Sequence, residues 1–140
     1  MSLLASLLAL VLLAIAALHL AWGMGLPWPG ADEAQRVATV IGIRGQAHMP
    51  PFGSCAVVAT ALASMAAMAV LHVHAPSLMS QLTVAAAALV FLGRGIAPWL
   101  PAWRRFTPQQ PFARLDRILY GPLCLVLGAG LTVIALGTAA

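Results

Sequence analysis

Six polar or aromatic residues have the side-chain types needed to bind an anion and to exchange a proton. A histidine titrates near neutral pH, with an unperturbed pKa of about 6.5. An arginine binds anionic or carbonyl groups, and an aspartate can orient either side chain. His19 and Arg94 lie inside otherwise apolar stretches, where an ionisable residue requires an explanation. The predicted polar cluster consists of His19, Trp22, Arg94, Arg114, Asp116 and Tyr120.

Two interpretations of His19 and Arg94 remain open from the sequence. In the structural one, each lies in the last turn of a predicted helix, where the helix dipole favours a cation by about 0.3–1 kcal/mol and an arginine extends toward the headgroups. In the functional one, both side chains face inward and meet Asp116 in a polar pocket closed by Trp22 and Tyr120.

A soft metal or haem site is a further possibility that the spacing does not favour. The donors that the topology brings to one membrane end are His19, His48, Met49, Cys55 and Cys124. The chain contains no Cys-x-x-Cys, no His-x-x-x-His and no methionine-rich cluster. His72 and His74 belong to the opposite end, and their spacing places them on different helix faces. We therefore predict no metal and no cofactor.

Motifs of the common enzyme classes are also missing from the sequence. There is no nucleophile elbow, glycine-rich phosphate loop, zinc-protease motif or paired-carboxylate site. Asp32 and Glu33, beside Arg36, are typical of a solvated turn or a helix start. The sequence neither predicts nor excludes an enzymatic activity.

The composition predicts that a membrane surrounds these residues. Of 140 residues, 62% are hydrophobic and 7% charged, whereas a soluble domain carries about 25% charged residues. The formal net charge of +4 does not indicate nucleic-acid binding, because six of the seven arginines flank or separate apolar spans instead of forming a free basic patch. We predict a single transmembrane domain over residues 1–140.

Four apolar stretches are each long enough for one helical crossing of about 20 residues. The predicted fold is an all-α bundle of four transmembrane helices, with spans of about 3–22, 52–71, 78–97 and 118–136. Ser77 is the predicted cap of the third helix, and Pro98 limits its end. Asp116 is a candidate cap of the fourth helix, and Pro122 either kinks that helix or marks a later start. A signal peptide is disfavoured as an explanation of the first span because no basic residue precedes it.

The distribution of arginines predicts the orientation of the bundle. The first and third loops carry arginines, whereas the second loop and both termini carry none. The positive-inside rule therefore places these two loops in the cytoplasm and both termini in the periplasm. All four tryptophans and Tyr120 belong to the same end, where they form a one-sided aromatic belt.

The least generic stretch of the chain is residues 111–128, with the pattern Phe112-Ala-Arg114-x-Asp116-x-x-x-Tyr120-x-Pro122-Leu-Cys124. This pattern resembles a bacterial membrane family classed as domain of unknown function 3995. Two further matches are His19-Leu-Ala-Trp22-Gly-Met-Gly25 and Phe91-Leu-Gly-Arg94-Gly-Ile96. The chain departs from the family at residues 98–101 and at Gly121, where a serine is common. The resemblance implies a small helical inner-membrane protein and supplies no reaction.

These observations favour a small polytopic inner-membrane protein. Its polar cluster either stabilises the bundle or docks membrane lipids or a membrane protein partner. The alternative is a pocket for a small amphipathic molecule such as a quinone, isoprenoid or lipid. A transporter subunit is less favoured, because the central halves of the spans carry almost no polar side chains.

Overall fold

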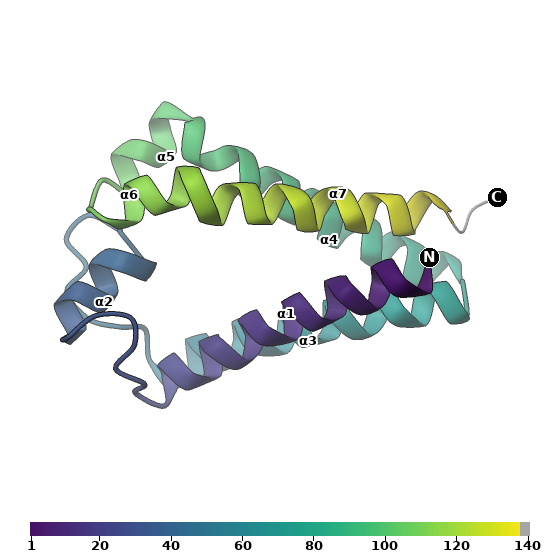
Figure 1. Cartoon of the computed structure of the whole chain (residues 1–140), viewed down its shortest axis with the longest axis horizontal. Coiled ribbons are helices and arrows are strands. Elements are labelled where there is room, and N and C mark those ends of the chain that lie inside the picture. Colours follow the sequence, from purple (N-terminus) through teal and green to yellow (C-terminus); the bar gives the residue numbers. More distant parts are fainter. Residues whose placement is uncertain (138–140) are drawn as a thin grey trace.

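The protein is helical throughout the part that the computed structural model describes, residues 1–137 (Figure 1). Within this range, four helical segments are long and apolar enough to cross a membrane, as predicted. They are α1 (Ser2–Gly23), α3 (Phe52–His74), Leu78–Trp99 and Phe112–Gly137. The third segment comprises α4 (Leu78–Ile96) and the 3-10 turn η1 (Ala97–Trp99). Two short helices, α2 (Glu33–Val40) and α5 (Pro101–Phe106), lie in the first and third loops.

The four long helices form two hairpins. Helix α1 packs mainly against α3, and α4 packs mainly against the last helix, α7 (Gly121–Gly137). Small buried residues allow close helix approach in each hairpin, as is common in membrane helices. In the first hairpin these are Ala5, Ala9, Ala16, Ala59, Ala66 and Ala69, and in the second they include Ala87, Ala88, Gly95 and Gly128.

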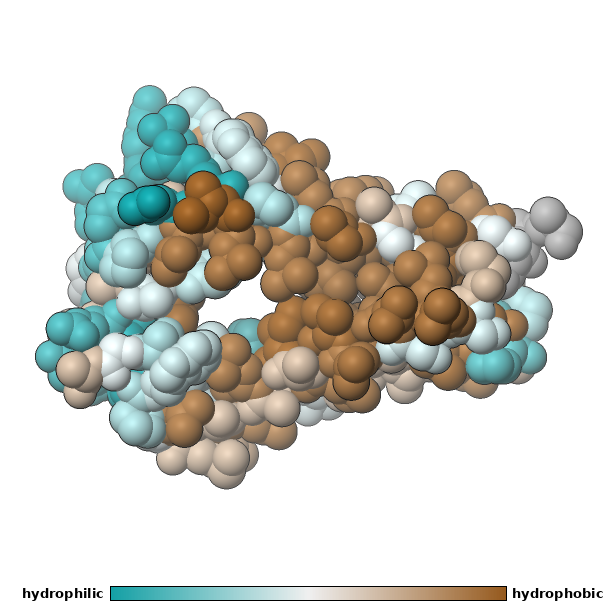
Figure 2. Space-filling model, in the orientation of Figure 1, coloured by the Kyte–Doolittle hydropathy of each residue, from teal (hydrophilic) through white to brown (hydrophobic). Residues whose placement is uncertain are grey.

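The hairpins meet at one end and diverge toward the other. At the closed end, Leu8 of α1 lies against Gly130 of α7, and Met1 lies against Gly137. Toward the arginine-rich end the two hairpins separate, and Figure 2 shows an opening through the molecule with apolar residues on both sides. The predicted four-helix arrangement is therefore closely packed at one end only.

The last span differs from its prediction at its start. It begins at Phe112, not near residue 118, and runs through α6 (Phe112–Leu115), the π-helical turn η2 (Asp116–Tyr120) and α7. The prediction of Asp116 as a helix cap is therefore wrong, since Asp116 lies inside the helix and is buried. Pro122 lacks a backbone N–H and its ring crowds the carbonyl four residues earlier. The helix accommodates this by widening, and the Gly121 N–H bonds to the Asp116 carbonyl five residues before it.

The short turn between the hairpins carries the cap predicted at Ser77. The Ser77 hydroxyl accepts a hydrogen bond from the Ser80 N–H at 3.1 Å and caps α4. Helix α3 continues past residue 71, the predicted end of the second span, to His74, so His72 and His74 both belong to this helix. Their faces differ as the spacing predicts, with His72 buried and His74 exposed.

A polar cap closes the arginine-rich end of the molecule. We use "cap" for residues 24–51 and 100–120, which contain α2, α5, α6 and η2. Asp32 begins α2 by accepting a hydrogen bond from the Gln35 N–H at 2.8 Å, which confirms the helix-start interpretation of this residue. The first and third loops are joined by the bond from the Arg44 N–H to the Phe106 carbonyl at 3.0 Å. The cap thus connects the two hairpins where their helices diverge.

Candidate functional site

Three side chains from separate elements form the central polar contact at the place where α4 meets the cap. Arg94 comes from the last turn of α4, Trp103 from α5 and Asp116 from η2. The Arg94 Nη2 donates to Asp116 Oδ1 at 2.5 Å, and the Trp103 Nε1 donates to Asp116 Oδ2 at 2.8 Å. We call these three residues the clamp, because they tie the ends of α4, α5 and the last span together.

The two charged side chains of the clamp differ in their exposure to solvent. The Asp116 side chain is 2% exposed, whereas the Arg94 side chain is 30% exposed. The Arg94 guanidinium carbon lies 4.9 Å from the centre of the Trp103 ring, within the range of a cation–π contact. Both Asp116 oxygens are engaged, so the carboxylate has protein partners for its charge. The Arg94 Nη1 is buried and has no hydrogen-bond partner within the described residues.

The structure brings together part of the predicted polar cluster. Arg94 and Asp116 meet as the inward-facing interpretation predicts. Tyr120 lies four residues after Asp116, and its hydroxyl donates to the Thr39 carbonyl of α2 at 3.1 Å. Its ring also packs against Phe112, with 5.7 Å between ring centres. Tyr120 therefore joins the last span to the first loop.

No described contact joins the clamp to His19, Trp22 or Arg114. His19 Nδ1 lies 2.8 Å from the Ile15 carbonyl of its own helix, and its ring packs edge-on against Trp22 at 5.3 Å. Trp22 donates its indole N–H to the Trp28 carbonyl. Arg114 is exposed. Because α1 continues to Gly23, His19 also lies before the last turn, contrary to the sequence interpretation.

Two further polar contacts involve residues outside the predicted polar cluster. Trp103 was placed only in the aromatic belt, and no sequence spacing distinguishes it from Trp99 as a partner of Asp116. At the opposite end, buried His72 contacts the Ser80 hydroxyl through Nδ1 at 2.8 Å. The sequence signal for this contact was position: His72 and Ser80 lie eight residues apart, on either side of the turn that joins α3 to α4.

The potential metal donors lie apart. Within residues 1–137, no group of three or more histidine, cysteine, aspartate or glutamate side chains is positioned to hold a metal ion. Cys55 is buried, and its thiol lies 3.8 Å from the Pro50 carbonyl. His48 contacts Glu33 at 3.5 Å, so this histidine belongs to the loop structure of the cap.

Glu33 connects the start of α2 to the end of the first loop through a hydrogen bond with Met49. Its Oε1 accepts a hydrogen bond from the Met49 N–H at 2.8 Å. This bond is the largest cause that holds the pKa of Glu33 below its ordinary value of 4.5, and the contact with the His48 side chain is the second largest. The carboxylate is therefore favoured in the folded loop.

Acidification should open this contact. Since the folded-state pKa is the lower one, the contribution of Glu33 is fully present above the unfolded-state pKa and is lost as the pH falls through the folded-state pKa. We expect amide hydrogen exchange at Met49, corrected for intrinsic rate, to accelerate between about pH 6 and about pH 3. The Glu33→Gln protein should show fast exchange at both values. Equal protection of Met49 in the two proteins at the higher pH would contradict this role.

The chain matches the family model described as protein of unknown function (DUF3995) over residues 12–131. The chain belongs to this family. The part that matches DUF3995 includes the clamp and every residue of the predicted polar cluster. No curated protein and no solved structure matches the chain. Membership of DUF3995 assigns no activity, so the geometry of the cap has to carry the functional argument.

Proposed function

We propose that the protein is a non-catalytic inner-membrane protein whose cap lies at the cytoplasmic surface and docks to anionic lipid headgroups. The observation that carries the proposal is the unbalanced charge of the cap. The cap contains six of the seven arginines of the chain and all three of its acidic residues. Arg94 is the only arginine that forms an ion pair within residues 1–137.

Each acidic residue has a structural task of its own. Asp32 caps α2, Glu33 binds the Met49 N–H, and Asp116 accepts from Arg94 and Trp103. Among the described residues, the other arginines form no ion pair with a carboxylate, although Arg36 interacts with Glu33 at longer range. The inner leaflet of a bacterial membrane supplies negative charge, and a basic side chain near such a surface gains about 1 kcal/mol. The positive-inside rule supports the orientation.

The clamp would give this docking surface a fixed shape. It joins α4, α5 and the last span through one buried carboxylate, while Tyr120 and the Arg44–Phe106 bond attach the first loop. A rigid surface loses less entropy on binding than a mobile one. In this proposal, the clamp holds the docking surface in shape and the exposed arginines bind the lipid headgroups.

Tryptophan fluorescence tests the proposal because all four tryptophans lie at or near the cap. The protein is reconstituted with brominated phosphatidylglycerol or brominated phosphatidylcholine, and quenching is compared. We expect stronger quenching by the anionic lipid in about 0.01 M salt, and a much smaller difference in about 1 M salt, where the Debye length falls from about 30 to about 3 Å. Equal quenching by both lipids at low salt would reject the proposal.

A pocket for a small amphipathic molecule is the second candidate. The opening between the hairpins in Figure 2 and the unpartnered Arg94 Nη1 favour it. It has less support than docking, because the described contacts of His19 and Trp22 are with their own segment rather than with Arg94 and Asp116. A defined extra mass retained by the purified protein in native mass spectrometry would favour this candidate.

A further inference from the structure

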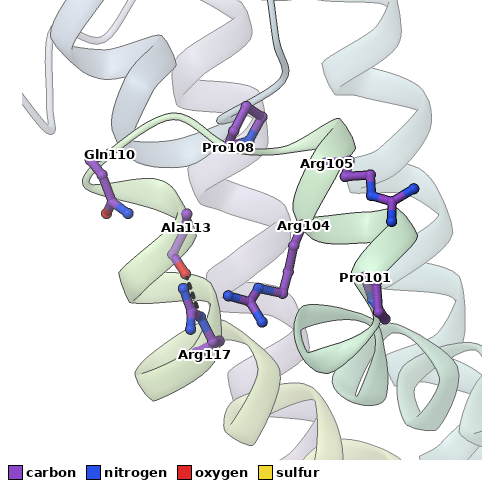
Figure 3. A pocket seen from close by; sticks show the side chains of 7 residues that line it. All are labelled: Pro101, Arg104, Arg105, Pro108, Gln110, Ala113 and Arg117. Atoms are coloured by element: carbon purple, nitrogen blue, oxygen red, sulfur yellow. Dashed lines mark hydrogen bonds between the residues drawn. The ribbon is translucent and has the colours of Figure 1, made fainter.

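A hollow in the cap lies between α5 and the start of the last span (Figure 3). Its volume is about 380 Å³, and Arg104, Arg105 and Arg117 line it together with Gln110 and Ala113. In Figure 3, the Arg104 side chain extends across the hollow toward Arg117, whereas Arg105 points away from that pair. Two arginines from different elements therefore line one concave surface.

No acidic side chain balances these charges. The lining contains none, and the neighbouring Asp116 uses both oxygens for Arg94 and Trp103. The Arg117 Nε donates to the Ala113 carbonyl at 3.2 Å, which holds the side chain along the hollow and leaves its two terminal nitrogens as further donors. Like charges that face one another are stabilised by an anion between them. Within residues 1–137, the lining of the hollow supplies no acidic counter-ion for these arginines.

We propose that this hollow binds a phosphate group, and that the phosphate belongs to an anionic lipid headgroup. Guanidinium groups donate paired hydrogen bonds to phosphate oxygens, which fits two arginines that line one hollow. The inference rests on the proposed docking function and specifies one site within it.

The position of the hollow favours a lipid as the source of the phosphate. Trp99 and Trp103 lie just before and within α5, and tryptophan is enriched at the level of the headgroups. Figure 2 shows the hydrophilic surface over α5 and α6 directly beside the hydrophobic surface of the long helices. A lipid bound with its phosphate in the hollow would place its chains along that apolar surface.

The test compares arginines inside and outside the hollow. Arg104→Gln and Arg117→Gln each remove a charge from it, and Arg114→Gln removes an exposed charge that does not line it. The full-length proteins, purified in detergent, are titrated with phosphatidylglycerol, phosphatidylcholine or inorganic phosphate, and bound molecules are counted by native mass spectrometry. We expect a preference for phosphatidylglycerol, weakened about fivefold by either hollow substitution and less than twofold by Arg114→Gln.

The outcomes separate this site from the general docking function. Arg104 has no described side-chain hydrogen bond, so Arg104→Gln should fold even if Arg117→Gln does not. If all three substitutions weaken phosphatidylglycerol binding equally, the hollow is rejected and docking by total charge survives. If phosphatidylglycerol is not preferred but inorganic phosphate binds and Arg104→Gln weakens it, the lipid assignment and the docking function are both overturned. Absence of any effect of the hollow arginines on either ligand would overturn the phosphate site itself.

Discussion

Arg94→Ala should destabilise the folded protein by about 3–5 kcal/mol, the usual cost of removing one partner of a buried ion pair. The substitution leaves the Asp116 carboxylate, which is 2% exposed, with only the Trp103 indole as a partner. It also removes the cation that lies over the Trp103 ring. Equilibrium unfolding in mixed micelles, followed by circular dichroism, measures the change.

Two companion variants make this expectation specific to the clamp. Arg114→Ala also removes one arginine, but from an exposed position, and should change stability by no more than about 0.5 kcal/mol. Asp116→Asn should cost less than Arg94→Ala, because the stranded Arg94 is 30% exposed and retains access to solvent. Adding Asp116→Asn to Arg94→Ala should recover stability, since no buried charge then remains. Equal stability of the Arg94→Ala and Arg114→Ala proteins would contradict the role of the clamp.

Properties that depend on position along the membrane normal were predictable from the sequence. Apolar length defined the four spans, and arginine and tryptophan content identified the end at which the polar residues gather. One of the two open interpretations of Arg94 had it meet Asp116, because both residues were placed at that depth next to consecutive spans. The two side chains form an ion pair even though the start of the last span was misplaced.

Properties that depend on helix rotation and spacing were not predictable. His19 was placed at the same depth as Arg94, but depth does not determine which way a side chain faces or how far apart two helices lie. The hairpins diverge at this end, and the described contacts of His19 stay within α1. The π-helical turn depends on how the helix accommodates Pro122, which the sequence left open between a kink and a later start.

The stability of the second hairpin should depend on two glycines at the contact between its helices. Gly95 of α4 lies against α7, and Gly128 of α7 lies against α4. A Cβ atom at Gly95 would lie 2.9 Å from the Leu125 backbone nitrogen, and one at Gly128 would lie 2.9 Å from the Leu92 backbone nitrogen. Backbone atoms cannot rotate away as a flexible side chain can. α4 and α7 therefore approach each other at a distance that only glycine permits at these positions.

Gly95→Ala and Gly128→Ala should each destabilise the protein by about 1–3 kcal/mol, the usual cost of inserting a methyl group into a packed interface. Gly93→Ala is the matched control, because it lies on the same helix and a Cβ there meets no atom within 4 Å. Alanine is favoured over glycine in a helix by about 0.5–1 kcal/mol, so this variant should be at least as stable as the native protein. The substitutions at residues 93 and 95 should thus have opposite signs in the same unfolding assay. A stabilising effect of Gly95→Ala equal to that of Gly93→Ala would show that α4 and α7 are not held at the close distance that the two glycines allow.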